Sequence, residues 1–244
     1  MKRFERPLKT RGYEMDATGY VPVSTLARFM EHTRWQAMQD PEFGLSNYWS
    51  RGVLRAQRIE ILKRVSFDVD LVIDCAVARI GRTSFDLCNH MRRRDDGALV
   101  ARGIATPVNL DARGRPSPID PRMSELLSTS PEFPSIELLP APPGAWSRDV
   151  AVCPSDQDVQ QHVNHARYLD YVEDTRALAA RAGAYGDAGG AEPLRRLAIS
   201  YEFQATVGDT LWAATWTIPG SGFGFELRRV SPERELVARA RIEI

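Results

Sequence analysis

The chain has 244 residues, of which 43% are hydrophobic and 26% are charged, and its formal net charge at pH 7 is zero. This length and composition are those of a globular protein that can bury one or two hydrophobic cores. The neutral balance argues against broad binding to nucleic acid or to a membrane surface. No apolar run approaches the ~20 residues of a membrane span, and the N-terminal stretch lacks the apolar core of a signal peptide.

Residues 3–14 alternate weakly and predict a first strand. Residues 21–39 then predict a helix, because less polar side chains recur at helical spacing on one face: Leu26, Phe29, Met30, Thr33 and Ala37. After a loop at 40–52, strand-like runs follow at 54–65, 71–80, 84–93 and 98–110, separated by hairpin signals. One helix followed by consecutive antiparallel strands indicates an α+β unit in which a sheet wraps around the helix.

The stretch from 117 to 147 is rich in proline and has no sustained period. It predicts an extended surface linker, with a short helix at 123–127 as an option.

The second half predicts the same order of elements. A strand at 147–153 precedes a helix, a Gly-rich loop occupies 183–190, and strands follow at 194–204, 210–218, 223–230 and 235–244. The less polar face of this helix comprises Tyr168, Tyr171, Val172, Thr175 and Ala179.

The two halves also repeat in sequence. Residues 13–21 lie over residues 155–163 at an offset of 142, so that Asp16 falls on Asp158 and Tyr20 on His162. The tetrapeptide Leu-Val-Ala-Arg occurs near the end of each half, at 99–102 and 236–239. We therefore predict an N-terminal unit at 1–115, a linker at 116–145 and a C-terminal unit at 146–244.

The most informative stretch of the chain opens the second helix. Asp158, Gln160 and His162 crowd into a turn, and Asn164 stands where a helix N-cap is expected. Unpaired N–H groups and the helix dipole favour developing negative charge at such an end. This pattern indicates a place where a carbonyl group can be polarised.

The double unit, the Asp16–Val21 opening and the run from Asp158 to Asn164 resemble the acyl-ACP thioesterases. This is the double hotdog family that includes the plant fatty acyl-ACP thioesterases and bacterial relatives. The resemblance covers nearly the whole chain. It implies a fold of two tandem hotdog units and hydrolysis of an acyl thioester by water, without a covalent Ser or Cys intermediate, a metal or another cofactor.

In that family an Asp-x-Asn-x-His motif precedes the second helix, and a Glu lies three residues after a Tyr on the next strand. Asp158 and His162 match the motif, whereas Gln160 replaces the Asn. Tyr201 matches the Tyr, and Gln204 replaces the Glu. Because an amide cannot accept a proton as a carboxylate does, the resemblance implies Asp158 as the base or water-orienting group.

The remaining roles follow from the same resemblance. His162 would polarise the thioester or exchange protons, while Gln160 and Gln204 would position water or thioester. Asn164, at the helix start, is the expected substrate-binding residue, and backbone N–H groups there would receive the oxyanion. Glu202, two residues before Gln204, is the alternative carboxylate. The first copy, with Tyr20 in place of His162, is interpreted as a degenerate site.

Several alternatives stay open at this point. Asp158 could merely cap a turn, and His162 could be an ordinary surface or core histidine. The two glutamines favour a non-catalytic acyl-thioester binding protein as the rival function, and an acyl-CoA thioesterase for short or aromatic groups is a second enzyme reading. The expected partner is acyl carrier protein or a CoA thioester, and pairing into a homodimer is left open.

The cysteines bear on the compartment. Cys75, Cys88 and Cys153 are odd in number, widely spaced and form no CxxC motif. We expect reduced core residues in a cytoplasmic protein.

Overall fold

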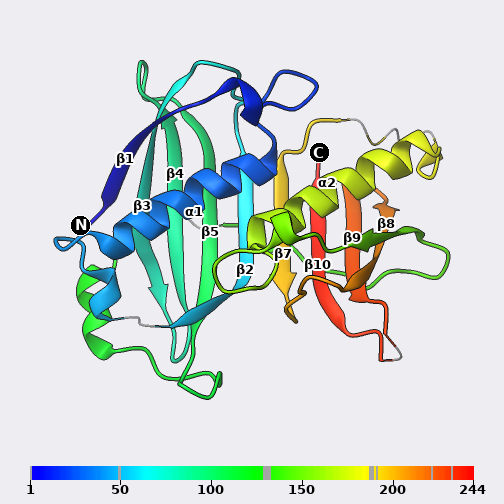
Figure 1. The fold of residues 1–244 in the computed structure, drawn as a ribbon. Coiled ribbons are helices and arrows are strands. Elements are labelled where there is room, and N and C mark those ends of the chain that lie inside the picture. The colour runs from blue at the N-terminus through cyan, green and yellow to red at the C-terminus, as the bar shows by residue number, and fades with distance from the viewer. Residues whose placement is uncertain are drawn as a thin grey trace. The chain divides into compact units, whose positions relative to one another are not determined.

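The computed structural model describes residues 2–48, 51–128, 133–186, 190, 192–220, 222–231 and 233–244. The chain divides into two compact units, Met1–Pro134 and Ser135–Ile244. In each unit one long helix lies across one face of an antiparallel sheet (Figure 1). Each unit is therefore the α+β arrangement that the sequence predicts.

The first unit comprises β1 (Phe4–Lys9), α1 (Val23–Gln39), β2 (Gly52–Ile61), β3 (Asp70–Ile80), β4 (Phe85–Arg93) and β5 (Leu99–Asn109). Its strands are ordered β1-β3-β4-β5-β2, and neighbouring strands run antiparallel. The first strand is shorter than predicted, because Gly12–Glu14 form a 3-10 turn, η1, in which the Glu14 carboxylate accepts the Arg11 N–H at 2.8 Å. A second short turn, η2, spans Leu45–Asn47.

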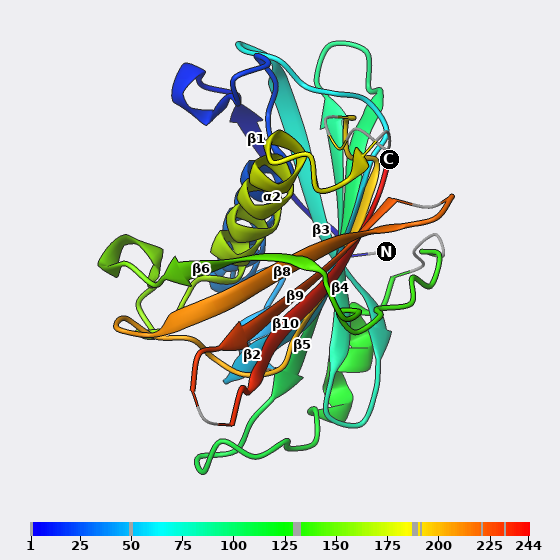
Figure 2. The same ribbon diagram turned by 90° about the vertical axis from the view of Figure 1, so that its right-hand side faces the viewer.

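The second unit comprises η4 (Pro154–Asp156), β6 (Trp146–Ala151), α2 (His165–Arg181), β7 (Arg196–Tyr201), β8 (Thr210–Ile218), β9 (Gly222–Arg229) and β10 (Leu236–Glu243). Its strands are ordered β6-β8-β9-β10-β7, again antiparallel. Figure 2 shows α2 along one side of these strands. Element by element, this is the strand order of the first unit, as the predicted duplication requires.

The predicted helix faces are buried in both units. All five face residues of α1 and all five of α2 belong to the buried set. Full burial of each large apolar side chain contributes about 1.5–3 kcal/mol, so these faces fix both helices on their sheets. The N-cap of α2 is Asn164, as predicted, whereas Pro22 occupies the N-cap position of α1 and provides no side-chain cap.

Part of the predicted linker belongs to the first core. Residues 121–126 form a 3-10 helix, η3 (Pro121–Leu126), and Ile119, Met123 and Leu126 pack in one cluster with Phe4 and Phe85. Those three apolar side chains make a surface position unfavourable. The boundary between the units consequently falls at residues 134 and 135, in the middle of the predicted linker.

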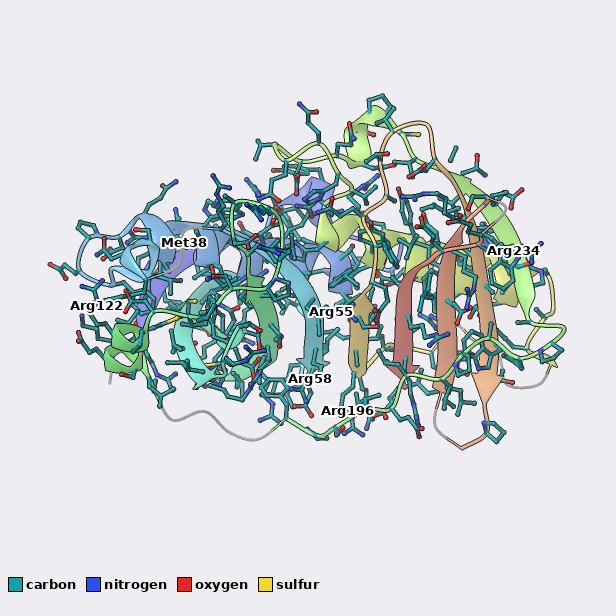
Figure 3. All side chains as sticks on the ribbon, turned by 90° about the horizontal axis from the view of Figure 1, so that it is seen from below. Met38, Arg55, Arg58, Arg122, Arg196 and Arg234 are labelled. Carbon is teal, nitrogen blue, oxygen red and sulfur yellow. The ribbon has the colours of Figure 1, made fainter. Side chains whose placement is uncertain are left out.

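Residues that follow η3 contact the sheet of the first unit. The Phe133 ring packs against Ala76, Cys88 and Ile104. Arg58, which Figure 3 labels on β2, donates to the Phe133 carbonyl at 3.3 Å and lies over its ring. The phenylalanine thus anchors this end of the proline-rich stretch.

The cysteines are free thiols, but only Cys75 and Cys88 are buried. The prediction of a core position is wrong for Cys153, which is exposed because it precedes the η4 turn, after β6 has ended. Within the described ranges, neither long helix has the length and apolar character needed to cross a bilayer.

Candidate active site

The turn that precedes α2 is built around Asp158. Its N–H donates to the His162 carbonyl at 3.0 Å, and its carbonyl accepts the Gln161 N–H at 3.0 Å. The Asp158 Oδ1 atom accepts the Gln160 N–H at 2.8 Å. One carboxylate oxygen of Asp158 therefore stabilises the turn, which agrees with the alternative that Asp158 caps a turn. The other oxygen faces His162.

The structure brings Asp158, Gln160 and His162 together. The Nδ1 atom of His162 lies 3.8 Å from Asp158 Oδ2, and its Nε2 atom lies 2.8 Å from Gln160 Oε1. The first distance is too long for a direct hydrogen bond, and the second is a good one if Nε2 carries the proton. The side chains of His162 and Asp158 are 19% and 25% exposed, so a small molecule can reach both.

Asn164 caps α2 and uses the start of the helix. Its Oδ1 atom accepts the Ala166 N–H at 2.9 Å, and its carbonyl accepts the Arg167 N–H at 2.9 Å. Two of the first N–H groups of the helix are therefore already engaged. Fewer N–H groups at the helix start are therefore free to receive an oxyanion than the sequence predicts. Any substrate-binding role of Asn164 is additional to its role as the helix cap.

The sequence predicts Gln204 at the end of a strand over 194–204, but the residue lies outside the observed strand. Because β7 ends at Tyr201, Gln204 stands in the following loop with an exposed side chain, and its carbonyl accepts Arg229 Nη2 at 2.7 Å. The next residue, Ala205, accepts the Val163 N–H at 2.9 Å. Gln204 directly precedes Ala205, and His162 directly precedes Val163, so this backbone hydrogen bond links the two neighbourhoods.

The first unit shows where a side chain at this position points. The Val21 N–H donates to the Val65 carbonyl at 2.8 Å, as Val163 does to Ala205, so Arg64 corresponds to Gln204. Arg64 Nη2 donates to Thr18 Oγ1 at 2.6 Å and lies 3.8 Å from Asp16 Oδ2. In the first unit, the side chain at the position of Gln204 thus reaches the turn that contains Asp16.

The two turns share their backbone geometry as well. Asp16 Oδ1 accepts the Thr18 N–H at 2.8 Å, as Asp158 Oδ1 accepts that of Gln160. At the next position both turns have a positive φ, 80° at Gly19 and 63° at Gln161. The first copy therefore retains the turn but carries Thr18 and Tyr20 where the second has Gln160 and His162.

A buried carboxylate outside the predicted set of site residues supports the turn. Asp156 is 3% exposed and accepts hydrogen bonds from the Cys153 N–H (2.8 Å), from Arg167 Nε and Nη2 (2.9 and 2.7 Å) and from the Tyr171 hydroxyl (2.8 Å). Burial alone would raise the pKa of Asp156, but these hydrogen bonds and the Arg167 charge outweigh it and leave the pKa lowered. The repeat does align Asp156 with Glu14. The sequence pattern, however, does not predict that Arg167 and Tyr171 on α2 bind the Asp156 carboxylate.

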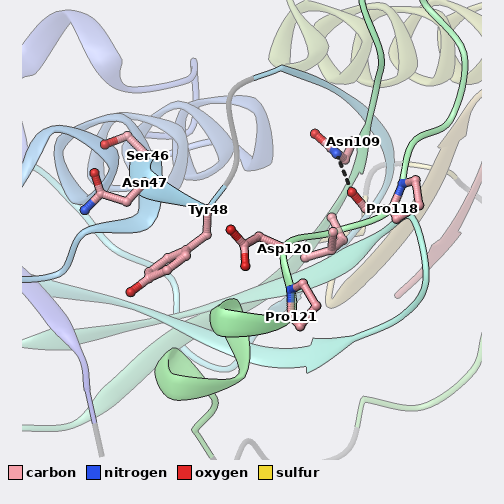
Figure 4. A pocket seen from close by; sticks show the side chains of 8 residues that line it. Ser46, Asn47, Tyr48, Asn109, Pro118, Asp120 and Pro121 are labelled. Carbon is pink, nitrogen blue, oxygen red and sulfur yellow. Dashed lines mark hydrogen bonds between the residues drawn. The ribbon is translucent and has the colours of Figure 1, made fainter.

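A cavity of about 510 Å³ lies in the first unit (Figure 4). Its lining consists of Ser46, Asn47, Tyr48, Asn109, Pro118, Ile119, Asp120 and Pro121. None of the predicted site residues belongs to this lining. Among the described residues, no group of three or more His, Cys, Asp and Glu side chains is arranged to hold a metal ion.

Known proteins share this architecture. Residues 10–127, just under half of the chain, match the family model of the Thioesterase-like superfamily. No curated protein shows significant sequence similarity to the chain.

Solved structures match over the whole length. An acyl-ACP thioesterase from Bacteroides thetaiotaomicron is 16% identical with a TM-score of 0.82, and the match covers 99% of this chain and 97% of that one. A 12:0-ACP thioesterase from Umbellularia californica is 18% identical with a TM-score of 0.81, covering 99% and 96%. These matches confirm the predicted fold. The chain has the double hotdog fold of the acyl-ACP thioesterases, and its first unit matches the Thioesterase-like superfamily.

Proposed function

We propose that the chain is a thioesterase, which hydrolyses an acyl thioester to a free acid and a thiol by direct attack of water. The observation that carries the proposal is the cluster of Asp158, Gln160 and His162 in the turn before α2. The cluster occurs in a chain with the fold of acyl-ACP thioesterases. Only the second copy combines this turn with a histidine and amide side chains.

Asp158 is the proposed general base. Its Oδ2 atom and His162 Nδ1 are 3.8 Å apart, so one water molecule can lie within hydrogen-bond distance of both. The water oxygen would bond to the thioester carbonyl carbon while its proton passes to Asp158. Collapse of the tetrahedral intermediate then breaks the C–S bond, and the proton passes to the leaving sulfur. General base catalysis of this kind contributes about 10²–10⁴-fold.

The glutamines are proposed to serve the carbonyl oxygen and the water. Gln160 Oε1 accepts from His162, so the amide nitrogen of Gln160 is the part that can donate to a developing oxyanion. Gln204 is proposed to reach the same turn, because Arg64 does so at the corresponding position of the first unit. Neither glutamine can take a proton from water, which leaves Asp158 as the base.

Acyl carrier protein is the proposed carrier, because two structural neighbours that match the whole chain are described as acyl-ACP thioesterases. An acyl-CoA is the second candidate carrier. The free thiols of Cys75, Cys88 and Cys153 fit a reducing, cytoplasmic setting. An acyl-ACP substrate would fit a role in fatty acid metabolism.

A panel of acyl-CoA and acyl-ACP thioesters of graded chain length tests the proposal by the rate of thiol release. We expect turnover with at least one member of the panel, and loss of turnover in Asp158→Asn. The rival reading, a binding protein that does not hydrolyse, is favoured by Gln160 and Gln204 in place of the Asn and Glu of the family. Saturable binding of the acyl thioester by calorimetry, without thiol release, would establish that reading instead.

A further inference from the structure

Two tyrosines on the buried face of α2 have hydrogen-bonded hydroxyl groups. Tyr168 and Tyr171 are 4% and 5% exposed, and their rings meet edge to face with centroids 6.1 Å apart. The Tyr168 hydroxyl accepts the Ala205 N–H at 3.1 Å. The Tyr171 hydroxyl donates to Asp156 Oδ2 at 2.8 Å. Adjacent positions on one helix face thus hold two separate segments.

These segments are the two halves of the candidate site. Ala205 directly follows Gln204 and also pairs with Val163. Asp156 stands two residues before Asp158, and its carbonyl accepts the Asn164 N–H at 2.9 Å. Through Ala205 and Asp156, the two hydroxyls fix both halves to the same rigid helix.

The first unit lacks both hydroxyls. The 142-residue offset places Leu26 at the position of Tyr168 and Phe29 at that of Tyr171, and both are buried, at 2% and 3% exposure. Packing of the helix on the sheet therefore needs no hydroxyl at either position. A buried hydroxyl carries a desolvation cost unless it is hydrogen-bonded, and here the groups occur in the copy that carries Asp158 and His162.

The hydroxyls keep their protons at neutral pH. Burial raises the pKa of Tyr168 to about 12. Burial and the hydrogen bond to the Asp156 carboxylate also raise the pKa of Tyr171. The bond from Tyr171 to the Asp156 carboxylate is charge-assisted and therefore among the stronger kind.

We propose that Tyr168 and Tyr171 are positioning residues, whose hydroxyls hold the Asp158–His162 turn and the Gln204 loop in register for catalysis. This inference rests on the proposed function for its catalytic consequence. Side chains that support a reacting group set its geometry, and a misplacement of 1 Å can cost ~100-fold in rate. The hydroxyls act through Asp156 and Ala205 and touch no reacting atom.

The test uses Tyr168→Phe and Tyr171→Phe, each of which removes one hydroxyl and keeps the ring. The matched control is Tyr185→Phe, because Tyr185 is 7% exposed and its hydroxyl bonds Thr215 Oγ1 at 2.8 Å beyond the opposite end of α2. Amide hydrogen exchange is measured for residues 153–163 and 203–206, together with kcat, KM and Tm. Exchange should accelerate at 203–206 in Tyr168→Phe and at 153–163 in Tyr171→Phe, and at neither segment in the control.

For the reaction we expect kcat to fall about 3- to 30-fold in each site variant, with KM within about twofold of the wild-type value and with Tm close to that of Tyr185→Phe. Faster exchange with kcat unchanged would overturn the catalytic consequence, and unchanged exchange would overturn the positioning itself. If the wild-type chain released no thiol from any thioester, the proposed function would fail. The exchange data would still decide whether the hydroxyls fix the two segments.

Discussion

The guanidinium carbon of Arg64 lies 3.7 Å from the centre of the Tyr20 ring. The repeat places Tyr20 at the position of His162, and the matching backbone hydrogen bonds Val21–Val65 and Val163–Ala205 place Arg64 at that of Gln204. A cation over an aromatic face gives about 0.5–2 kcal/mol, depending on how far it is desolvated. In the first copy, therefore, these two positions form a structural contact. In the second copy they carry an imidazole and an amide.

Gln204→Arg should close the second copy as Arg64 closes the first. The arginine should reach the Asp158 carboxylate and the Gln160 side chain, and turnover should fall at least ~100-fold because the base is paired with a cation and water is displaced. Steady-state thiol release measures the loss, and circular dichroism checks the fold.

The control for this substitution is Arg64→Gln, for which we expect turnover within about twofold of wild type and a slightly lower Tm, because a cation–π contact is lost. Equal losses of turnover in Gln204→Arg and Arg64→Gln would remove the basis for equating the two positions.

A second set of variants asks which residue near the end of β7 serves the reaction. Gln204→Ala should lower turnover through lost positioning, whereas Gln204→Glu should leave it similar or raise it, since a carboxylate can also take a proton. Glu202→Gln should have little effect, because Glu202 is outside the proposed site. Collapse of turnover in Glu202→Gln, with Gln204→Ala near wild type, would move the site to Glu202.

The fold was largely predictable because its signals are local and periodic. The five-residue faces of both helices, the strand runs and the Asn164 cap all follow from spacing of 3.6 or 2 residues and from turn chemistry. The packing of residues 119–126 in the first core was not predictable in the same way. These residues lie in a proline-rich stretch without a sustained period, so the sequence pattern does not link Ile119, Met123 and Leu126 to distant core residues.

The candidate site was predictable only as a group of neighbours in sequence. Asp158, Gln160 and His162 come together because they share one turn. Some of the contacts that brace this turn and the Gln204 loop join residues far apart in sequence, such as Arg167 with Asp156 and Tyr168 with Ala205. The sequence shows those tyrosines as ordinary members of a helix face, and only the structure reveals the partners of their hydroxyls.

Gly19 and Gln161 share a positive φ, so adding a side chain at Gly19 and removing the side chain at Gln161 should have opposite effects on stability. Nothing lies within 4 Å of a Cβ built on Gly19, so Gly19→Ala tests the backbone conformation alone. It should lower the free energy of unfolding by about 1–2 kcal/mol. Gln161→Gly should raise it slightly or leave it unchanged, since the relief of the left-handed conformation is partly offset by a larger unfolded-state entropy. Urea denaturation measures both, and a loss of stability in Gln161→Gly would contradict this account.

Asp156 predicts part of the acid sensitivity of the protein. Its pKa is lowered below the ordinary value of 3.8 in the folded state. The folded state therefore binds the proton less readily than the unfolded state, and the contribution to stability is present above about pH 5 and is lost as the pH falls through the folded-state pKa. Asp156→Asn should lower the free energy of unfolding at pH 7 and make its decline between pH 5 and 3 shallower. Urea titrations of both proteins at several pH values measure this, and parallel curves would show that Asp156 contributes nothing to the decline.

The central claim, that the second copy of the turn is the catalytic one, is tested most directly by Asp158→Asn and Asp16→Asn side by side. Asparagine keeps the Oδ1 acceptor that each turn uses, so both variants should fold, and only Asp158→Asn removes the proposed base. Thiol release from the best acyl thioester should fall about 10²–10⁴-fold in Asp158→Asn and stay near the wild-type rate in Asp16→Asn. Equal rates in the two variants, whether both high or both low, would contradict the assignment.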